Sequence, residues 1–174
     1  MNSANSSGLA GLIIDMQDYF LRRIEEKERG NMIQSQIGLI HYFSEQNIPI
    51  FILEYKKRGE TIEDITKEID FSKNEKPLTK TIGDGFYHTR LQRLLKKHKS
   101  KNLILMGIYA DDCVKATAEG ALSRRRYRIH TARDLIAEKK GYTNEEMEKT
   151  IENYYSAVGT FFRTGKELIN FLEK

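Results

Sequence analysis

Short apolar runs alternate with longer helical stretches along this chain, and this alternation limits the possible folds more than any other feature. The segments expected to be strands lie at 9–15, 48–55, 102–109, 127–131 and 159–163, and the segment at 79–86 is expected to be a connecting strand and loop with two glycines. Their short length and lack of helical spacing are typical of buried strands. The stretches expected to be helical lie at 20–46, 88–99, 113–126, 143–157 and 166–172. Alternation at this spacing predicts βαβ units, and hence an α/β fold with helices on both faces of a parallel sheet.

Local signals add detail to the expected helices. Gly30 is predicted to weaken the first long helix, because glycine is a poor helix former. Thr61 is expected to cap a short helix. Thr143 is expected to cap the helix that follows it, with Glu146 completing a capping box.

The length and composition fit one soluble globular domain. The 174 residues are expected to form a single domain over 1–174, with a flexible polar start at 1–8. No apolar run approaches the roughly 20 residues needed to cross a bilayer, and the start lacks the features of a signal peptide. With one cysteine no internal disulfide can form, so we expect a cytoplasmic protein without a membrane partner.

Two basic clusters contribute much of the net charge of +4, one at 96–101 and one at 124–128. They could form a nucleic-acid footprint, which would make binding strongly salt-dependent. Solvated helix ends are the alternative, because cations are favoured there. Both clusters fall at expected helix ends, so we favour the alternative and expect no nucleic-acid partner.

Side chains that can carry chemistry follow three of the predicted strands. Asp15 ends the first apolar run, Lys80 and Asp84 lie in the third segment at 79–86, and Cys113 follows the strongest strand. Ligands of open α/β sheets bind beyond the carboxyl ends of the strands, so we expect these side chains to converge. Each also has an ordinary interpretation, as a buried thiol, a helix N-cap or a solvated lysine. We favour a functional site because all of these residues are expected at the same edge of the sheet.

A cysteine nucleophile is the chemistry that this set favours. A thiol at a helix N-terminus near a lysine is expected to have a lowered pKa. Asp15 can accept the thiol proton and return it to a leaving group. The turn at 107–113 offers backbone N–H groups for an oxyanion hole. The chain is therefore predicted to be a hydrolase that uses Asp15, Lys80 and Cys113.

Other functions compete with this prediction. A phosphatase with Asp15 as nucleophile needs a second carboxylate two residues later, where this chain has Gln17. A dinucleotide site needs the pattern Gly-x-Gly-x-x-Gly after the first strand, and residues 15–20 lack it. A non-catalytic binding or redox-sensing module stays open as an alternative, since the single thiol can be oxidised.

Three motifs resemble those of the isochorismatase-like cysteine hydrolases, and the resemblance extends over 9–172. The motifs are LIIDMQDYF at 12–20, Lys80 followed by DGF at 84–86, and GIYADDCV at 107–114 with Thr117 and Ala121 after it. Each motif alone is weak evidence, whereas the three in this order and spacing are fairly specific to the family.

The resemblance implies a three-layer α/β/α arrangement with a Rossmann-like parallel sheet of about six strands. It also implies hydrolysis of a C–N bond in a small amide or ureido-type substrate through a thioester. Cys113 would attack the carbonyl carbon, Asp15 would move the proton and activate water, and Lys80 would orient the carboxylate. A cis peptide bond is implied between Ile108 and Tyr109, aiming the N–H groups of Tyr109 and Cys113 at the oxyanion.

The resemblance also bears on the pocket, metals and assembly. Phe20, Phe86 and Tyr109 are candidate walls of the substrate pocket, with core packing as the alternative for the two phenylalanines. The metal-binding branch of the family uses histidines after the second strand, and residues 55–80 contain none, so we expect no metal and no cofactor. The presence of Cys113 favours C–N hydrolysis over isochorismatase-type vinyl-ether hydrolysis, which stays an alternative. The partners expected are a small-molecule substrate and further copies of the chain in a homo-oligomer.

Some positions depart from the family pattern. Ala110 stands in place of a threonine, Tyr19 in place of an acidic residue and Tyr109 in place of a small one. Tyr109 would narrow the pocket or bring its hydroxyl to the substrate. Asp111 is expected to cap the following helix rather than to contact the substrate. Glu54 is expected to be a solvated strand end, with access to the pocket as the alternative.

Overall fold

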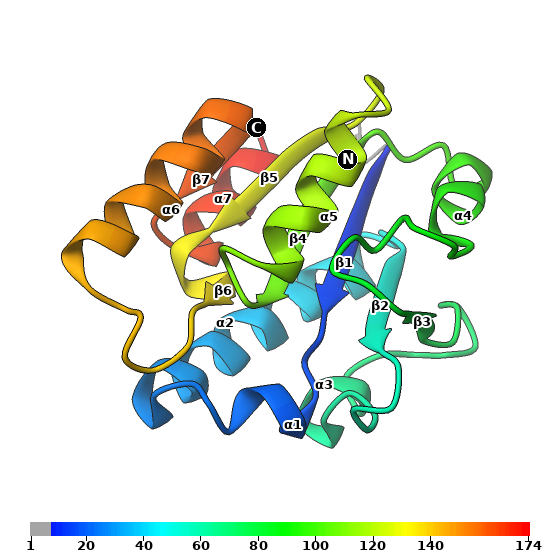
Figure 1. The fold of residues 1–174 in the computed structure, drawn as a ribbon. Coiled ribbons are helices and arrows are strands. Elements are labelled where there is room, and N and C mark those ends of the chain that lie inside the picture. The colour runs from blue at the N-terminus through cyan, green and yellow to red at the C-terminus, as the bar shows by residue number, and fades with distance from the viewer. Residues whose placement is uncertain (1–7) are drawn as a thin grey trace.

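A parallel sheet of seven strands is the centre of the fold over residues 8–174, the part of the chain that this computed structural model describes (Figure 1). The start expected to be flexible lies outside that part except for Gly8. The strands are β1 (Leu9–Ile14), β2 (Ile50–Tyr55), β3 (Leu78–Lys80), β4 (Asn102–Ile108), β5 (Arg128–Ala132), β6 (Ile136–Ala137) and β7 (Gly159–Phe162). Their order is β3-β2-β1-β4-β5-β7, and β6 also pairs with β4. From β1 the chain adds β2 and β3 on one side of the sheet, and it then returns to add β4, β5 and β7 on the other side. The strand order therefore reverses between β1 and β4, which makes this a switch point.

Helices cover both faces of the sheet. The helices are α1 (Asp18–Leu21), α2 (Glu26–Glu45), α3 (Glu63–Thr66), α4 (Leu91–Lys97), α5 (Cys113–Leu122), α6 (Glu145–Val158) and α7 (Gly165–Leu172), with a 3₁₀ turn at Arg133–Leu135. One buried cluster joins Ile13 of β1 to α2, α3 and α7, and the other joins Leu12 and Ile14 to α4, α5 and α6. Neighbouring residues of β1 thus face opposite layers, and because both layers are apolar the whole strand is apolar.

The α/β fold predicted from the alternation of elements, with a parallel sheet and helices on both faces, is confirmed. The sheet has one strand more than the six expected. The additional strand, β6, is two residues long and follows a 3₁₀ turn, so it leaves no periodic signal in the sequence. Its pairing with Gly107 and Ile108 supports the end of β4 directly before the turn to α5.

Three of the local helix signals are corrected. The stretch at 20–46 is interrupted near 22–25 rather than at Gly30, because the side chain of Glu25 accepts from the N–H of Glu28 and starts a new helix there. α3 begins at Glu63 without a side-chain cap from Thr61. α6 is capped by Asn144, whose side chain accepts from the N–H of Met147 at 2.9 Å.

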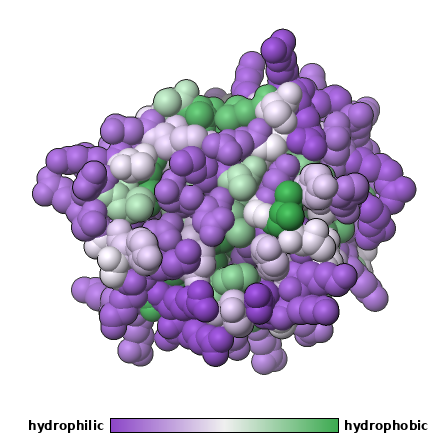
Figure 2. Space-filling view, viewed as in Figure 1, coloured by the Kyte–Doolittle hydropathy of each residue, from purple (hydrophilic) through white to green (hydrophobic). Residues whose placement is uncertain are grey.

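The outer surface is largely polar. Figure 2 shows hydrophilic residues over most of one face, with hydrophobic residues in small separate groups. The first basic cluster begins in the last turn of α4, where cations are favoured by the helix dipole, and the second follows the end of α5, whose last turn holds no basic residue. Among the described residues, no helix has the length and apolar character needed to span a bilayer.

Candidate active site

Asp15 comes directly after β1, at the switch point of the sheet. Its φ of 55° places it in the left-handed region, which aspartate tolerates better than most residues. Its N–H donates to the carbonyl oxygen of Leu53 in β2 at 2.9 Å. On the other side β4 approaches closely at Gly107, where any side chain would collide with the carbonyl oxygen of Ile14. The backbone around Asp15 is therefore held from both neighbouring strands.

A buried ion pair joins Asp15 to Lys80 at the end of β3. The Nζ atom of Lys80 lies 2.8 Å from Oδ2 of Asp15, and each side chain is at most 1% exposed. Lys80 also donates to the carbonyl oxygen of Ile82 at 3.2 Å and lies 4.7 Å from the ring centre of Tyr55. Within residues 8–174, Oδ1 of Asp15 has no hydrogen-bond partner. Asp15 thus keeps one oxygen available as a proton acceptor.

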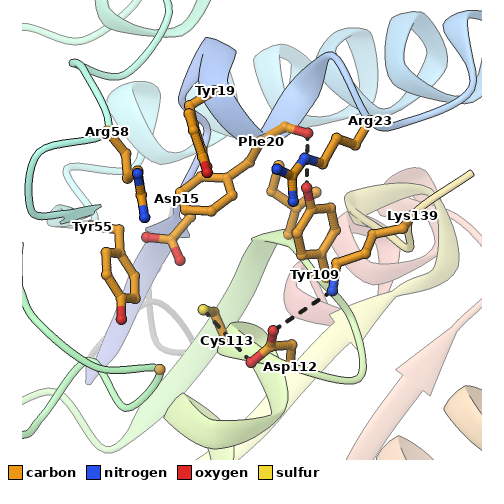
Figure 3. A pocket seen from close by; sticks show the side chains of 12 residues that line it. Asp15, Tyr19, Phe20, Arg23, Tyr55, Arg58, Tyr109, Asp112, Cys113 and Lys139 are labelled. Carbon is orange, nitrogen blue, oxygen red and sulfur yellow. Dashed lines mark hydrogen bonds and ion pairs between the residues drawn. The ribbon is translucent and has the colours of Figure 1, made fainter.

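Cys113 is the first residue of α5 and faces the same pocket as Asp15 (Figure 3). Its sulfur is nearly buried and lies 4.0 Å from Oδ1 of Asp112. Burial raises the pKa of the Cys113 thiol to about 12, and the negative charge of Asp15 adds to this against the opposing effect of Lys80. The expectation of a lowered thiol pKa is therefore wrong, because burial and two nearby carboxylates outweigh the lysine and the helix N-terminus.

Burial likewise raises the pKa of Asp15 above its ordinary value, while Lys80 opposes the rise. The thiol and the carboxylate are close enough that each changes the pKa of the other. Both groups therefore hold their protons more tightly than they would in water. The resting nucleophile is then a neutral thiol, and it requires a base at the moment of attack.

The turn from β4 to α5 presents two backbone donors next to the sulfur. The peptide bond between Ile108 and Tyr109 is cis. Within the described part of the chain, the N–H groups of Tyr109 and Cys113 donate to no backbone carbonyl, whereas those of Asp112 and Val114 both bond to the carbonyl of Tyr109. These two free donors form an arrangement that can stabilise a developing oxyanion.

The pocket in front of these groups has a volume of about 300 Å³. Its lining residues are Asp15, Tyr19, Phe20, Arg23, Tyr55, Arg58, Gly83, Ile108, Tyr109, Asp112, Cys113 and Lys139. Phe20 packs edge-on against Tyr55 and Tyr109, with ring centres 6.0 and 5.9 Å apart. The hydroxyl of Tyr109 donates to the carbonyl of Phe20 at 2.9 Å, so it is already partnered by the protein. Lys80 lies behind Asp15 and does not line the pocket.

Phe86 is a correction to the expected pocket. Its ring is buried in the core cluster and packs against Tyr127, with ring centres 5.6 Å apart, so it does not line the pocket. Asp84, expected at the same edge, accepts instead from the N–H of Phe86. The core interpretation of Phe86 is therefore the correct one.

Asp111 and Glu54 both have structural partners that differ from those expected. Asp111 does not cap α5, because its carboxylate pairs with Lys115 at 2.7 Å. Glu54 is half-buried and accepts from the N–H of Thr61 at 2.7 Å, so it fixes a loop and lies outside the pocket lining.

Sequence reasoning missed the three cations of the lining, Arg23, Arg58 and Lys139. Each lies after a structural element that leads to the carboxyl edge of the sheet, and that position is the only signal in the sequence. In residues 8–174, no group of three or more histidine, cysteine, aspartate or glutamate side chains is arranged to hold a metal ion.

Comparisons with known proteins identify a family and similar folds. Residues 10–161 match the family model of the isochorismatase domain. The fold is similar to that of N-carbamoylsarcosine amidase from Thermoplasma acidophilum, with 22% identity, a TM-score of 0.74 and coverage of 89% of this chain and 95% of that one. A cysteine hydrolase from Pseudomonas syringae pv. phaseolicola has 16% identity, a TM-score of 0.82 and coverage of 99% and 96%. A nicotinamidase from Staphylococcus aureus has 19% identity, a TM-score of 0.73 and coverage of 90% and 99%. No curated protein matches the sequence.

Proposed function

This chain belongs to the isochorismatase family of hydrolases, and from that premise we propose that it cleaves a C–N bond of a small amide or ureido-type compound with Cys113 as the nucleophile. The observation that carries the proposal is the buried pair of Asp15 and Lys80, 2.8 Å apart, because Asp15 lines the same pocket as the Cys113 thiol. Asp15 retains an oxygen with no hydrogen-bond partner in the described part of the chain, and a thiol with a pKa of about 12 needs such a base.

The first half of the reaction forms a thioester. The sulfur of Cys113 attacks the carbonyl carbon while its proton passes to Asp15. The N–H groups of Tyr109 and Cys113 stabilise the negative charge on the carbonyl oxygen. Asp15 then gives the proton to the departing nitrogen as the C–N bond breaks, and ammonia or an amine leaves.

The second half returns the enzyme to its starting state. Asp15 takes a proton from water, whose oxygen attacks the thioester carbon. The C–S bond breaks, the sulfur recovers the proton and the acid product leaves. Throughout, the ammonium of Lys80 compensates the charge of Asp15 and fixes its orientation, so that the carboxylate can gain and lose a proton in a buried site.

The test is a screen for ammonia release from small amides, ureido compounds and N-carbamoyl amines. We expect Cys113→Ala to lose about 10³-fold or more of the activity and Asp15→Asn to be similarly impaired. Glu119→Gln, an exposed position on the same helix, is the matched control and should keep full activity. Intact-mass analysis of a rapidly quenched reaction should detect an acyl group on the wild-type protein and none on Cys113→Ala.

Three outcomes would contradict the proposal. Ammonia release that is unchanged in Cys113→Ala would remove the nucleophile. A vinyl-ether hydrolase would instead be indicated by pyruvate release from isochorismate that does not depend on Cys113. If no turnover occurs with any substrate while mild peroxide converts the thiol to a reversible oxidised form, a redox-sensing module would be the better interpretation.

A further inference from the structure

Two arginines line the pocket on the rim opposite Cys113, and neither has a carboxylate partner among residues 8–174 (Figure 3). Arg23 follows α1, and Arg58 lies in the loop after β2. Within residues 8–174, neither guanidinium lies within 4.0 Å of a carboxylate oxygen. The other charges of the site are balanced, because Lys80 pairs with Asp15 and Lys139 lies 4.0 Å from Asp112. Arg23 and Arg58 therefore bring to the pocket two positive charges that no ion pair among the described residues compensates.

The ring of Tyr19 holds both arginines in place. The guanidinium carbon of Arg58 lies 4.2 Å from the ring centre, and that of Arg23 lies 5.2 Å from it. A cation over an aromatic face is attracted to the ring without losing its charge or its hydrogen-bond donors. Tyr19 can thus restrict the positions of the two guanidinium groups and leave them able to bind an anion.

The loop that carries Arg58 is fixed relative to Asp15 by a buried glutamine. The side chain of Gln17 donates to the carbonyls of Tyr55 and Gly59, at 3.1 and 2.5 Å, and accepts from the N–H of Tyr55 at 2.8 Å. Gln17 is only two residues from Asp15 and is fully buried. The backbone of the loop that carries Arg58 is therefore fixed relative to Asp15 before any ligand binds.

We infer that the substrate carries a carboxylate, which pairs with Arg58 and Arg23 while its amide or ureido carbon lies at Cys113. The inference rests on the proposed function and names the substrate class for that site. A guanidinium matches a carboxylate with two parallel hydrogen bonds, and the pocket of about 300 Å³ suits a small acid. The rings of Phe20, Tyr55 and Tyr109 provide an apolar wall for the atoms between the two polar ends.

The test compares charged and neutral forms of the same compounds, namely N-carbamoyl derivatives of glycine, alanine and β-alanine and their methyl esters. Binding to Cys113→Ala protein is measured by calorimetry, and turnover by the wild type is measured as ammonia release. We expect the acids to exceed their esters by about 10-fold or more in affinity and in kcat/KM. Arg58→Gln and Arg23→Gln should each raise KM for the acid by about 10-fold, with a smaller effect on kcat, so that the preference for the acid collapses.

Arg22→Gln is the matched control. Arg22 also lies over the ring of Tyr19, at 5.0 Å, but it does not line the pocket, so its loss should leave the acid preference unchanged. The inference is overturned if no acid is preferred to its ester in binding or turnover, or if the Arg23 and Arg58 variants match Arg22→Gln. Cys113-dependent hydrolysis of esters and acids alike would overturn it and leave the proposed function standing. Acid-selective binding without Cys113-dependent turnover would support the inference and contradict the proposed function.

Discussion

Lys80 and Asp15 form an ion pair of 2.8 Å in which neither side chain is more than 1% exposed. Removing one partner of such a pair leaves an uncompensated buried charge, which typically costs about 3–5 kcal/mol. We therefore expect Lys80→Met to lower the free energy of unfolding by about that amount and the hydrolytic activity by about 100-fold or more. Urea unfolding and steady-state kinetics measure the two effects.

Two further variants separate charge pairing from packing. The double variant Asp15→Asn with Lys80→Met removes both charges, so it should recover much of the lost stability but none of the activity. Lys149→Met removes the exposed pair with Glu145 and should change stability by less than about 1 kcal/mol. Equal losses for the Lys80 and Lys149 variants would show that the buried pair has no special role.

The raised pKa of Cys113 predicts the pH dependence of its alkylation. Because only the thiolate reacts, and its fraction grows until the pH reaches about 12, the rate with iodoacetamide should rise about tenfold per pH unit from pH 7 to 10. The unfolded protein should instead level off near pH 8.5, the ordinary value for cysteine. Asp15→Asn should react faster than the wild type at each pH, because a nearby negative charge is removed. A plateau below pH 9 in the folded wild type contradicts the assignment.

The raised pKa of Asp15 predicts where activity is lost in acid. The reaction requires the carboxylate as base, so kcat/KM falls when Asp15 takes up a proton. Since its pKa lies above the ordinary value near 3.9, the acid limb should lie above pH 4. The profile is measured from pH 3.5 to 9, and full recovery after return to pH 7 excludes unfolding. Activity that persists undiminished to pH 4 would rule out Asp15 as the base.

Gly107 is predicted to be intolerant of a side chain. Its φ of +131° and its contact with the carbonyl of Ile14 leave no room for a methyl group, so Gly107→Ala should destabilise the fold by about 2–4 kcal/mol. Gly38 is the control, because a methyl group there meets nothing within 4 Å and its helix position favours alanine. Gly38→Ala should stabilise the protein by about 0.4–1 kcal/mol. Thermal melting compares the two, and a neutral Gly107→Ala would contradict the close packing of β4 on β1.

The edge of the sheet that carries the site was predictable from the sequence, whereas the full pocket was not. Asp15 and Cys113 come after strands and Lys80 ends one, and parallel strands end at the same edge, so their proximity follows from topology. Arg23 and Arg58 lie in connections whose path depends on contacts such as those of Gln17, which no local pattern reveals.

Two errors arose where tertiary packing overrides local chemistry. Phe86 sits in a motif next to the site but turns into the core against Tyr127. The position of Cys113 at a helix start favours a thiolate, yet burial and the charge of Asp15 raise the thiol pKa. Both outcomes depend on neighbours that are distant in sequence, and therefore on the assembled fold.

The connection between α3 and β3 divides the site into two incomplete halves. Asp15, Arg23 and Arg58 precede it, whereas Lys80 and Cys113 follow it. A chain cut within this connection would leave one fragment with the base and the arginines and another with the thiol and the lysine. Hydrolysis would then depend on reassociation of the fragments through the β2–β3 and β1–β4 pairings, which makes this fold a natural basis for a split reporter.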